Sequence, residues 1–150
     1  MTEHSAKSDA LDSAVRTLPI RLPPVDGEAL DSWLEAVSHR LASAWGDFVD
    51  AVGLPAAPSD LGRTPWLTRL TPAEAAGISV ATGQQLAELH AMTLVRYDGT
   101  GLRIRQDTRT ANRAFPWSRM RFSRFCPDCL RDSGGRWRLY WRLGWAFACE

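Results

Sequence analysis

The chain has 150 residues, a hydrophobic fraction of 45% and a formal net charge of +1, which is typical of a packed protein with one domain or two very small ones. No stretch approaches the ~20 uncharged apolar residues of a membrane span, and the polar first residues lack the apolar run of a secretory signal. We therefore expect a cytoplasmic protein without a membrane segment, whose three cysteines are reduced thiols and not a disulfide framework.

After a loose tail at residues 1–17, the first predicted elements are two helices. Asp26 can cap the first helix, and the second ends at Gly53 and Pro55. The apolar side chains of the first recur at helical spacing, at Leu30, Trp33, Leu34, Val37 and Leu41. The inward side chains of the second are Trp45, Phe48, Val49 and Val52. The beginning of the chain is therefore expected to be a small helical core.

The next segment has the pattern of a helix-turn-helix. Thr71 can cap a short helix at residues 72–76, which Gly77 would end in the left-handed conformation. A second helix then begins at Ser79 or Thr82, and it buries Leu86, Leu89 and Met92. Tightly joined helices of any function give this pattern, so a DNA-reading helix and a plain helix corner both stay open. If the second helix reads DNA, its contacts come from Ser79, Thr82, Gln84 and Gln85.

The second half of the chain is basic. Residues 1–75 contain eleven acidic and six basic side chains, whereas residues 76–150 contain twelve arginines and six acidic side chains. A turn at residues 98–101 is followed by alternation typical of a short strand over 102–105. The candidate phosphate contacts are Arg103, Arg105, Arg109, Arg113, Arg119, Arg121 and Arg124. Aromatic residues interleave with them, so they either grip a nucleic acid or lie with their stems over an aromatic core.

Cysteine spacing near the end of the chain indicates a metal site. Cys126 and Cys129 form a knuckle, and Cys149 follows at a distance suited to a ribbon-type zinc site. We predict one structural zinc with these three ligands, with the fourth ligand absent from this chain and zinc retention therefore weak. Unmetallated thiols are the simplest alternative. A catalytic zinc would need a general base, and the spacing places none of Asp128, Asp132 and Glu150 beside the metal.

Between the cysteines, the apolar run at residues 137–147 has tryptophans at every fourth position, which favours a helix, and an aromatic content that favours a strand. The pattern leaves both open. The expected fold is mainly α: a helical region with a helix-turn-helix-like unit at residues 18–95, then an arginine- and aromatic-rich segment at 96–150 with an incomplete zinc ribbon.

Three segments in this order resemble TniQ-type proteins. Residues 27–34 (GEALDSWL) resemble the GES-x-x-SWL opening of that family, and residues 76–94 are similar to its GLS…L…MTL segment. Residues 125–130 (FCPDCL), followed by Trp141 and Cys149, match its zinc segment. In the family, that segment continues into a histidine after the third cysteine and often into a second CxxC, whereas this sequence stops at Glu150.

The resemblance implies a transposition accessory protein that is not itself a nuclease. Such a protein selects or marks the target site and works with an AAA+ ATPase and a DDE transposase. The leading hypothesis is therefore a target-selection adaptor that contacts DNA and the ATPase, with a homodimer also compatible. The alternative is a stand-alone helix-turn-helix transcriptional regulator, which would bind one operator sequence as a dimer.

Overall fold

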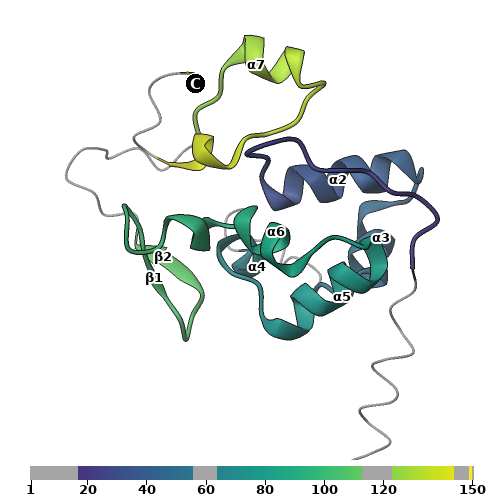
Figure 1. The fold of residues 1–150 in the computed structure, drawn as a ribbon, viewed down its shortest axis with the longest axis horizontal. Helices are drawn as coiled ribbons and strands as arrows, with labels where there is room; N and C mark the ends of the chain where they lie inside the picture. The colour runs from purple at the N-terminus through teal and green to yellow at the C-terminus, as the bar shows by residue number, and fades with distance from the viewer. Residues whose placement is uncertain (1–16, 56–63, 113–122, 144–148, 150) are drawn as a thin grey trace, which may run out of the picture.

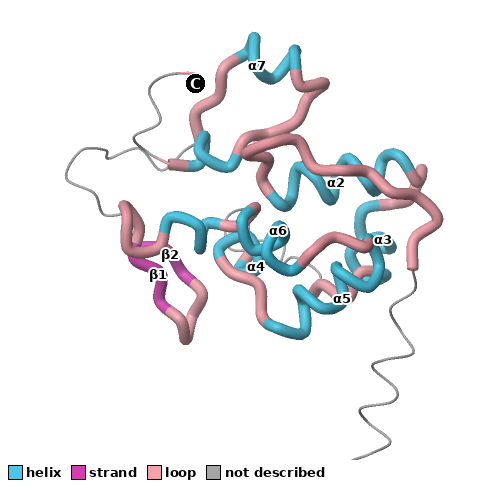
Figure 2. The backbone as a smooth tube through the Cα atoms, viewed as in Figure 1, coloured by secondary structure: helices cyan, strands magenta, loops and turns pink. Residues whose placement is uncertain are grey.

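A computed structural model describes residues 17–55, 64–112, 123–143 and 149, and in these ranges the chain is mainly helical, as predicted (Figure 1). Figure 2 shows that loops connect short helices and one small hairpin. The α-helices are α2 (Leu30–Arg40), α3 (Trp45–Ala51), α4 (Pro65–Thr68), α5 (Pro72–Thr82), α6 (Leu86–Ala91) and α7 (Pro127–Asp132). The 3-10 turns are η1 (Leu94–Tyr97) and η2 (Leu139–Arg142), and the hairpin consists of β1 (Arg103–Arg105) and β2 (Thr110–Asn112).

The larger hydrophobic core lies between α2, α3, α4, α5 and α6. The predicted apolar stripe of α2 is confirmed, because Leu30, Trp33, Leu34 and Val37 are all buried. The indole Nε1 of Trp33 also donates to the carbonyl of Leu22 at 2.9 Å, which holds the proline-rich lead-in against this helix. The other helices of this core also bury predicted side chains, such as Phe48, Val49, Leu89 and Met92. The predicted burial of Leu86 was wrong, because this side chain is 49% exposed.

The start of α2 differs from the prediction. Ala29 and not Asp26 is the N-cap residue, and no side chain caps this helix. The reason is a long-range pairing: the N–H of Ala29 donates to the carbonyl of Trp137, and the N–H of Leu139 donates to the carbonyl of Gly27, both at 2.8 Å. Gly27 turns the chain in the left-handed conformation, at φ +70°. Glu28 and Ala29 are thereby held beside the C-terminal segment, where Glu28 forms a β-bridge with Arg138, so the helix begins only after them.

The α5–α6 pair also differs from the prediction. The cap at Thr71 is confirmed, and a capping box joins it to Glu74. The break at Gly77 was wrong, because α5 continues through this buried glycine, and Gly83 instead takes the left-handed conformation, at φ +77°. Continuing the helix buries Ile78 and Ala81 on the core face. The turn therefore lies at residues 83–85, and Gln85 is the N-cap of α6 and not the third residue of a capping box.

A second, smaller core joins the hairpin to the residue before α2 and to the C-terminal segment. In the hairpin, Arg103 pairs with Asn112 and Arg105 with Thr110. The predicted alternation is confirmed, because Ile104 is buried between two exposed arginines. The buried members of this core are Ala29, Leu94, Leu102, Ile104, Leu139 and Leu143. Ala29, the N-cap of α2, is thus packed together with residues of the C-terminal segment.

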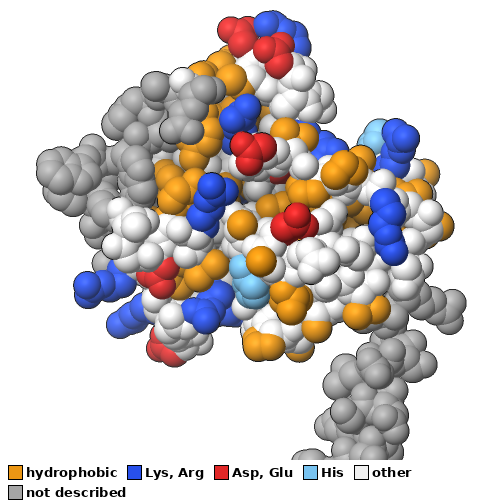
Figure 3. Space-filling view, viewed as in Figure 1, with side chains coloured by type: hydrophobic (Ala, Val, Ile, Leu, Met, Phe, Trp, Pro, Cys, Tyr) orange, Lys and Arg blue, Asp and Glu red, His pale blue; other side chains and the backbone are white. Residues whose placement is uncertain are grey.

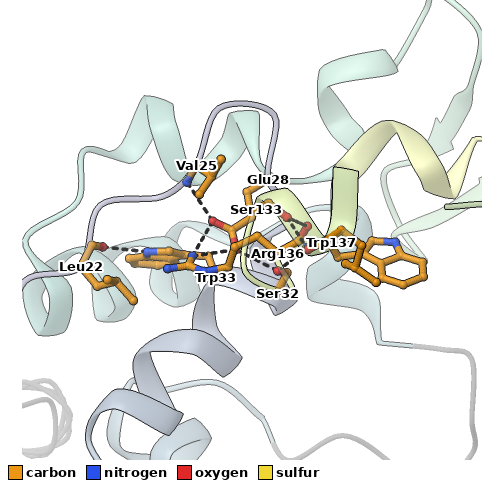
Figure 4. A network of polar contacts seen from close by, with 9 residues as sticks. Leu22, Val25, Glu28, Ser32, Trp33, Ser133, Arg136 and Trp137 are labelled. Atoms are coloured by element: carbon orange, nitrogen blue, oxygen red, sulfur yellow. Dashed lines mark hydrogen bonds and ion pairs between the residues drawn. The ribbon is translucent and has the colours of Figure 1, made fainter. Parts of the chain in front are cut away.

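A buried ion pair anchors the C-terminal segment on α2 (Figure 4). Arg136 donates from Nη1 to both carboxylate oxygens of Glu28, each at 2.8 Å, and the Glu28 side chain is 0% exposed. The same carboxylate accepts from the hydroxyl of Ser32 and from the N–H of Val25, and the Ser32 hydroxyl in turn accepts from the N–H of Trp137. This network closes the chain around the start of α2.

Within the described ranges, the longest helices have eleven residues, and none of the helices is long and apolar enough to cross a membrane.

Candidate metal centre and nucleic-acid interface

The three cysteines converge, as their spacing predicted. The Sγ atoms of Cys126, Cys129 and Cys149 all lie within 4.8 Å of one another. Cys126 is the N-cap of α7, and its Sγ accepts from the N–H of Cys129 at 3.5 Å. Pro127 at the first helical position begins the turn that returns Cys129 to the same side. The first turn of α7 therefore places two of the sulfur atoms together, and Cys149, twenty residues after Cys129, brings the third.

Hydrogen bonds within the cluster shift the pKa values of two of its thiols in opposite directions. The backbone N–H of Cys129, together with bonds from the Cys149 and Cys129 thiols, lowers the pKa of the Cys126 thiol. Bonds to Cys126 and then to Cys129 raise the pKa of the Cys149 thiol to about 12. In the metal-free cluster, the lowered pKa favours the thiolate form of Cys126, and Cys149, with its raised pKa, keeps its proton and donates. A metal ion would replace those shared protons.

The cluster fits a zinc ion as three of its ligands. At a Zn–S distance of about 2.3 Å, tetrahedral thiolates lie roughly 3.8 Å apart, so the sulfurs need to close by no more than about an ångström. Soft thiolate ligands select zinc, Cu(I) or iron–sulfur clusters over Mg²⁺ or Ca²⁺. Within the described residues, this group of potential ligands has three members. A bound zinc would link Cys149 to Cys126 and Cys129 at α7. Its role would then be structural.

The acidic residues nearest the knuckle are engaged elsewhere. Asp128 pairs with Arg131 at 2.6 Å, and Asp132 lies 3.9 Å from the same guanidinium. All three side chains are more than 70% exposed. Glu150, the third acid considered as a base, lies outside the described residues. Both carboxylates thus lie on the exposed surface beside Arg131.

The predicted phosphate contacts separate into four groups. Arg103 and Arg105 are exposed on β1, and Figure 3 shows basic side chains at the lower left, over the hairpin, with acidic side chains among them. Arg109 is a structural residue, because its Nη1 donates to Glu74 at 2.6 Å and to the carbonyl of Arg69 at 3.2 Å. The backbone N–H of Arg124 donates to Trp141. The other predicted contacts, Arg113, Arg119 and Arg121, lie outside the described residues.

The predicted DNA contacts on α5, on α6 and in the turn between them differ in how far they are exposed. Thr82 is 5% exposed and donates its hydroxyl to the carbonyl of Ile78 at 2.6 Å. The Thr82 hydroxyl accepts from the N–H of Gln84 at 3.3 Å, and the Ser79 hydroxyl donates to the carbonyl of Gln84 at 2.7 Å, so both hydroxyls stabilise the turn between the helices. Gln85 is exposed and Gln84 is half-buried. Among these residues, Gln85 is thus the side chain best placed to meet a partner.

Several residues that organise the site carry no sequence signal of their own. Glu28 and Arg136 are far apart in the chain, and so are Asp31 and Arg142, which form a second ion pair between α2 and η2. Gly134 and Gly135 have positive φ values of +68° and +89°, and they turn the chain from α7 toward Glu28. The paired glycines are the only one of these features that a sequence pattern could have identified, as the end of a helix.

Comparison with known proteins gives one match. A family model described as TniQ matches residues 19–150. Neither the curated proteins nor the solved structures contain a match.

Proposed function

The chain belongs to the TniQ family, which is associated with transposition, and on that premise we propose that it is a target-selection adaptor that contacts DNA and an AAA+ ATPase. The family match over residues 19–150 carries this proposal. The adaptor would bring the ATPase, and through it the transposase, to the chosen DNA. Its zinc segment would be structural, and it would have no catalytic step of its own.

The exposed hairpin supports the DNA contact. Arg103 and Arg105 flank the buried Ile104, so both guanidiniums project from the same face of β1. Packing of Ile104 in the second core holds that face rigid. Two arginines on one rigid strand can each donate a charge-assisted pair of hydrogen bonds to a DNA phosphate. We assign the backbone contact to this strand.

The double substitution of Arg103→Gln and Arg105→Gln should weaken binding to a 20-base-pair duplex by about tenfold at low salt. Each lost phosphate contact should also lower the slope of log affinity against log salt by about one. Fluorescence anisotropy at several salt concentrations measures both quantities. Arg103→Gln alone should give about half of this change in slope, and Arg40→Gln is its charge-matched control, because Arg40 is exposed at the end of α2, on the other side of the molecule from the hairpin in Figure 1. Equal salt slopes for the original chain, the double variant and Arg40→Gln would contradict the assignment.

The contact with the ATPase is tested by capture. The tagged 150-residue chain, incubated with an AAA+ ATPase of the transposition type, should retain that protein, and an unrelated AAA+ ATPase should not be retained. Leu86 and Val80 are large apolar side chains that are 49% and 56% exposed on the α5–α6 pair. Leu86→Glu and Val80→Glu should each reduce capture several-fold if this surface takes part. Undiminished capture by both variants would place the ATPase elsewhere on the chain.

The α5–α6 pair gives the regulator alternative little support. Neither α5 (PAEAAGISVAT) nor α6 (LAELHA) contains a lysine or an arginine, and α6 has six residues. A recognition helix without a basic side chain lacks the usual donors for phosphate and guanine. Protection of one operator sequence by a dimer of this chain would nevertheless favour the regulator over the adaptor.

A further inference from the structure

A cavity of about 420 Å³ opens where the hairpin turn meets the N-terminus of α5 and the side of α6. Leu70, Pro72 and Leu86 form its apolar walls. Its polar lining consists of Arg69, Thr71, His90, Gln106 and Arg109. The cavity thus combines two guanidinium groups with a neutral amide, a hydroxyl and an imidazole, and no carboxylate lines it.

The two arginines of this cavity differ in how their charge is balanced. Arg109 is neutralised by Glu74, whose carboxylate lies 2.6 Å away and is 8% exposed. Arg69 donates from Nη1 to the side-chain oxygen of Gln106, which is neutral. In the described part of the chain, no carboxylate pairs with Arg69. The Arg69 guanidinium therefore retains an uncompensated charge at the cavity wall.

The charges around the cavity are mixed. The cavity lies at the N-terminus of the eleven-residue helix α5, but the Glu74 carboxylate of the capping box already offsets that end of the helix. In the hairpin, the exposed Arg105 precedes Gln106 and the exposed Asp107 follows it. The lining of this cavity has no carboxylate, whereas another cavity, of about 300 Å³, is lined by Asp31 and Glu35 as well as Arg142. The unpaired charge of Arg69 therefore favours an anionic ligand at the cavity beside α5.

We propose that this cavity is a phosphate-binding site for the DNA backbone, with Arg69 as the principal donor. Gln106 holds the guanidinium in place, and the fork of Arg69 donates to the phosphodiester oxygens. The exposed Arg103 and Arg105 extend the positive surface along the hairpin, which suits a chain of phosphates better than one acidic side chain of a protein. This inference rests on the proposed function, because DNA is its ligand.

The test uses two variants of the full chain and one duplex. Arg69→Gln removes the charge, and Gln106→Glu neutralises it by placing a carboxylate beside the guanidinium. Each should weaken binding of a 20-base-pair duplex by about tenfold and lower the salt slope by about one. Gln106 is exposed in the hairpin turn, so Gln106→Glu should fold normally even if Arg69→Gln loses stability.

Two controls match these changes in charge away from the cavity. Arg40→Gln on α2 removes one positive charge, and Ala51→Glu at the exposed end of α3 adds one negative charge. Both should leave affinity and slope within about twofold of the original chain, which separates a local phosphate contact from a change in net charge. Thermal unfolding of each protein verifies that it is folded.

The outcomes separate this inference from the proposed function. If the original chain binds DNA and all four variants bind equally well, the phosphate site is wrong and the adaptor proposal stands. If the original chain does not bind DNA even at low salt, the DNA contact and the phosphate site both fail. If Arg69→Gln and Gln106→Glu keep DNA affinity but reduce capture of the ATPase, the ligand is an acidic protein segment and the phosphate assignment is overturned.

Discussion

Replacing Glu28 by alanine should lower the free energy of unfolding by about 3–5 kcal/mol, the usual effect of removing one partner from a buried ion pair. Glu28 is 1% exposed, and its carboxylate accepts hydrogen bonds from Arg136, Ser32 and the N–H of Val25. The substitution would leave the guanidinium, which is only 16% exposed, without its counter-charge. Urea unfolding followed by circular dichroism measures the difference.

The matched control is Glu88→Ala, which removes an exposed carboxylate of α6 and should change stability by less than about 0.5 kcal/mol. The double variant Glu28→Met, Arg136→Met should be more stable than the sum of the single effects predicts, because neither charge is then left buried alone. Hydrogen exchange gives a second readout. The N–H groups of Ala29 and Leu139, which join the two segments, should lose protection in Glu28→Ala. A Glu28→Ala protein as stable as Glu88→Ala would contradict the anchoring role.

Replacing Cys126 by serine should abolish zinc binding. Cys126 is the N-cap of α7, and its sulfur lies within 4.8 Å of both other ligand sulfurs. A hydroxyl is a poor zinc ligand at neutral pH, so only two thiolates would remain. Native mass spectrometry should find up to one zinc per original chain, held weakly enough for a chelator to remove it, and none in Cys126→Ser. Retention of a full equivalent by Cys126→Ser would exclude this site.

Asp128→Asn provides the control for the metal experiment. Asp128 lies between the two knuckle cysteines, but its exposed carboxylate pairs with Arg131 and does not belong to the ligand group. This variant should therefore bind zinc like the original chain. A large loss of zinc from it would mean that a carboxylate completes the site.

Zinc affinity should also rise with pH. The thiol of Cys149, whose pKa is raised to about 12, is protonated at neutral pH in the metal-free chain. Binding must release that proton, so affinity should increase between about pH 6 and pH 8 and fall as the pH decreases. Competition with a chromogenic chelator at several pH values measures this dependence, and an affinity independent of pH would show that the thiols are not the ligands.

Local patterns in the sequence account for several elements. The helical spacing of Leu30, Trp33, Leu34 and Val37 predicts α2, because one face of that helix must be buried. Thr71 and Pro72 predict the start of α5, because both satisfy the first turn of a helix. The spacing of Cys126 and Cys129 predicts a shared metal ligand pair, since a short turn brings both sulfurs to one side. In each case the interacting residues are close in the chain.

Tertiary structure decided the features that depend on competition between distant segments. Gly77 and Gly83 can both end a helix, and α5 continues past the first because doing so buries Ile78 and Ala81. Arg109 reads in the sequence as one phosphate contact among many, whereas the fold places it against Glu74.

In the C-terminal segment, too, some features follow from the sequence pattern and others only from the fold. Its cysteine spacing indicates the ligands, but whether the apolar run after Cys129 forms a helix or a strand cannot be predicted from its pattern. The described part of that run contains the 3-10 turn η2, because it packs against the start of α2 through Glu28 and Arg136. The sequence alone thus determined the family resemblance, the principal apolar faces and the group of cysteines that could hold a metal ion. The fold determined which charged residues are used internally and which are left for a partner, since burial is a property of the packed chain.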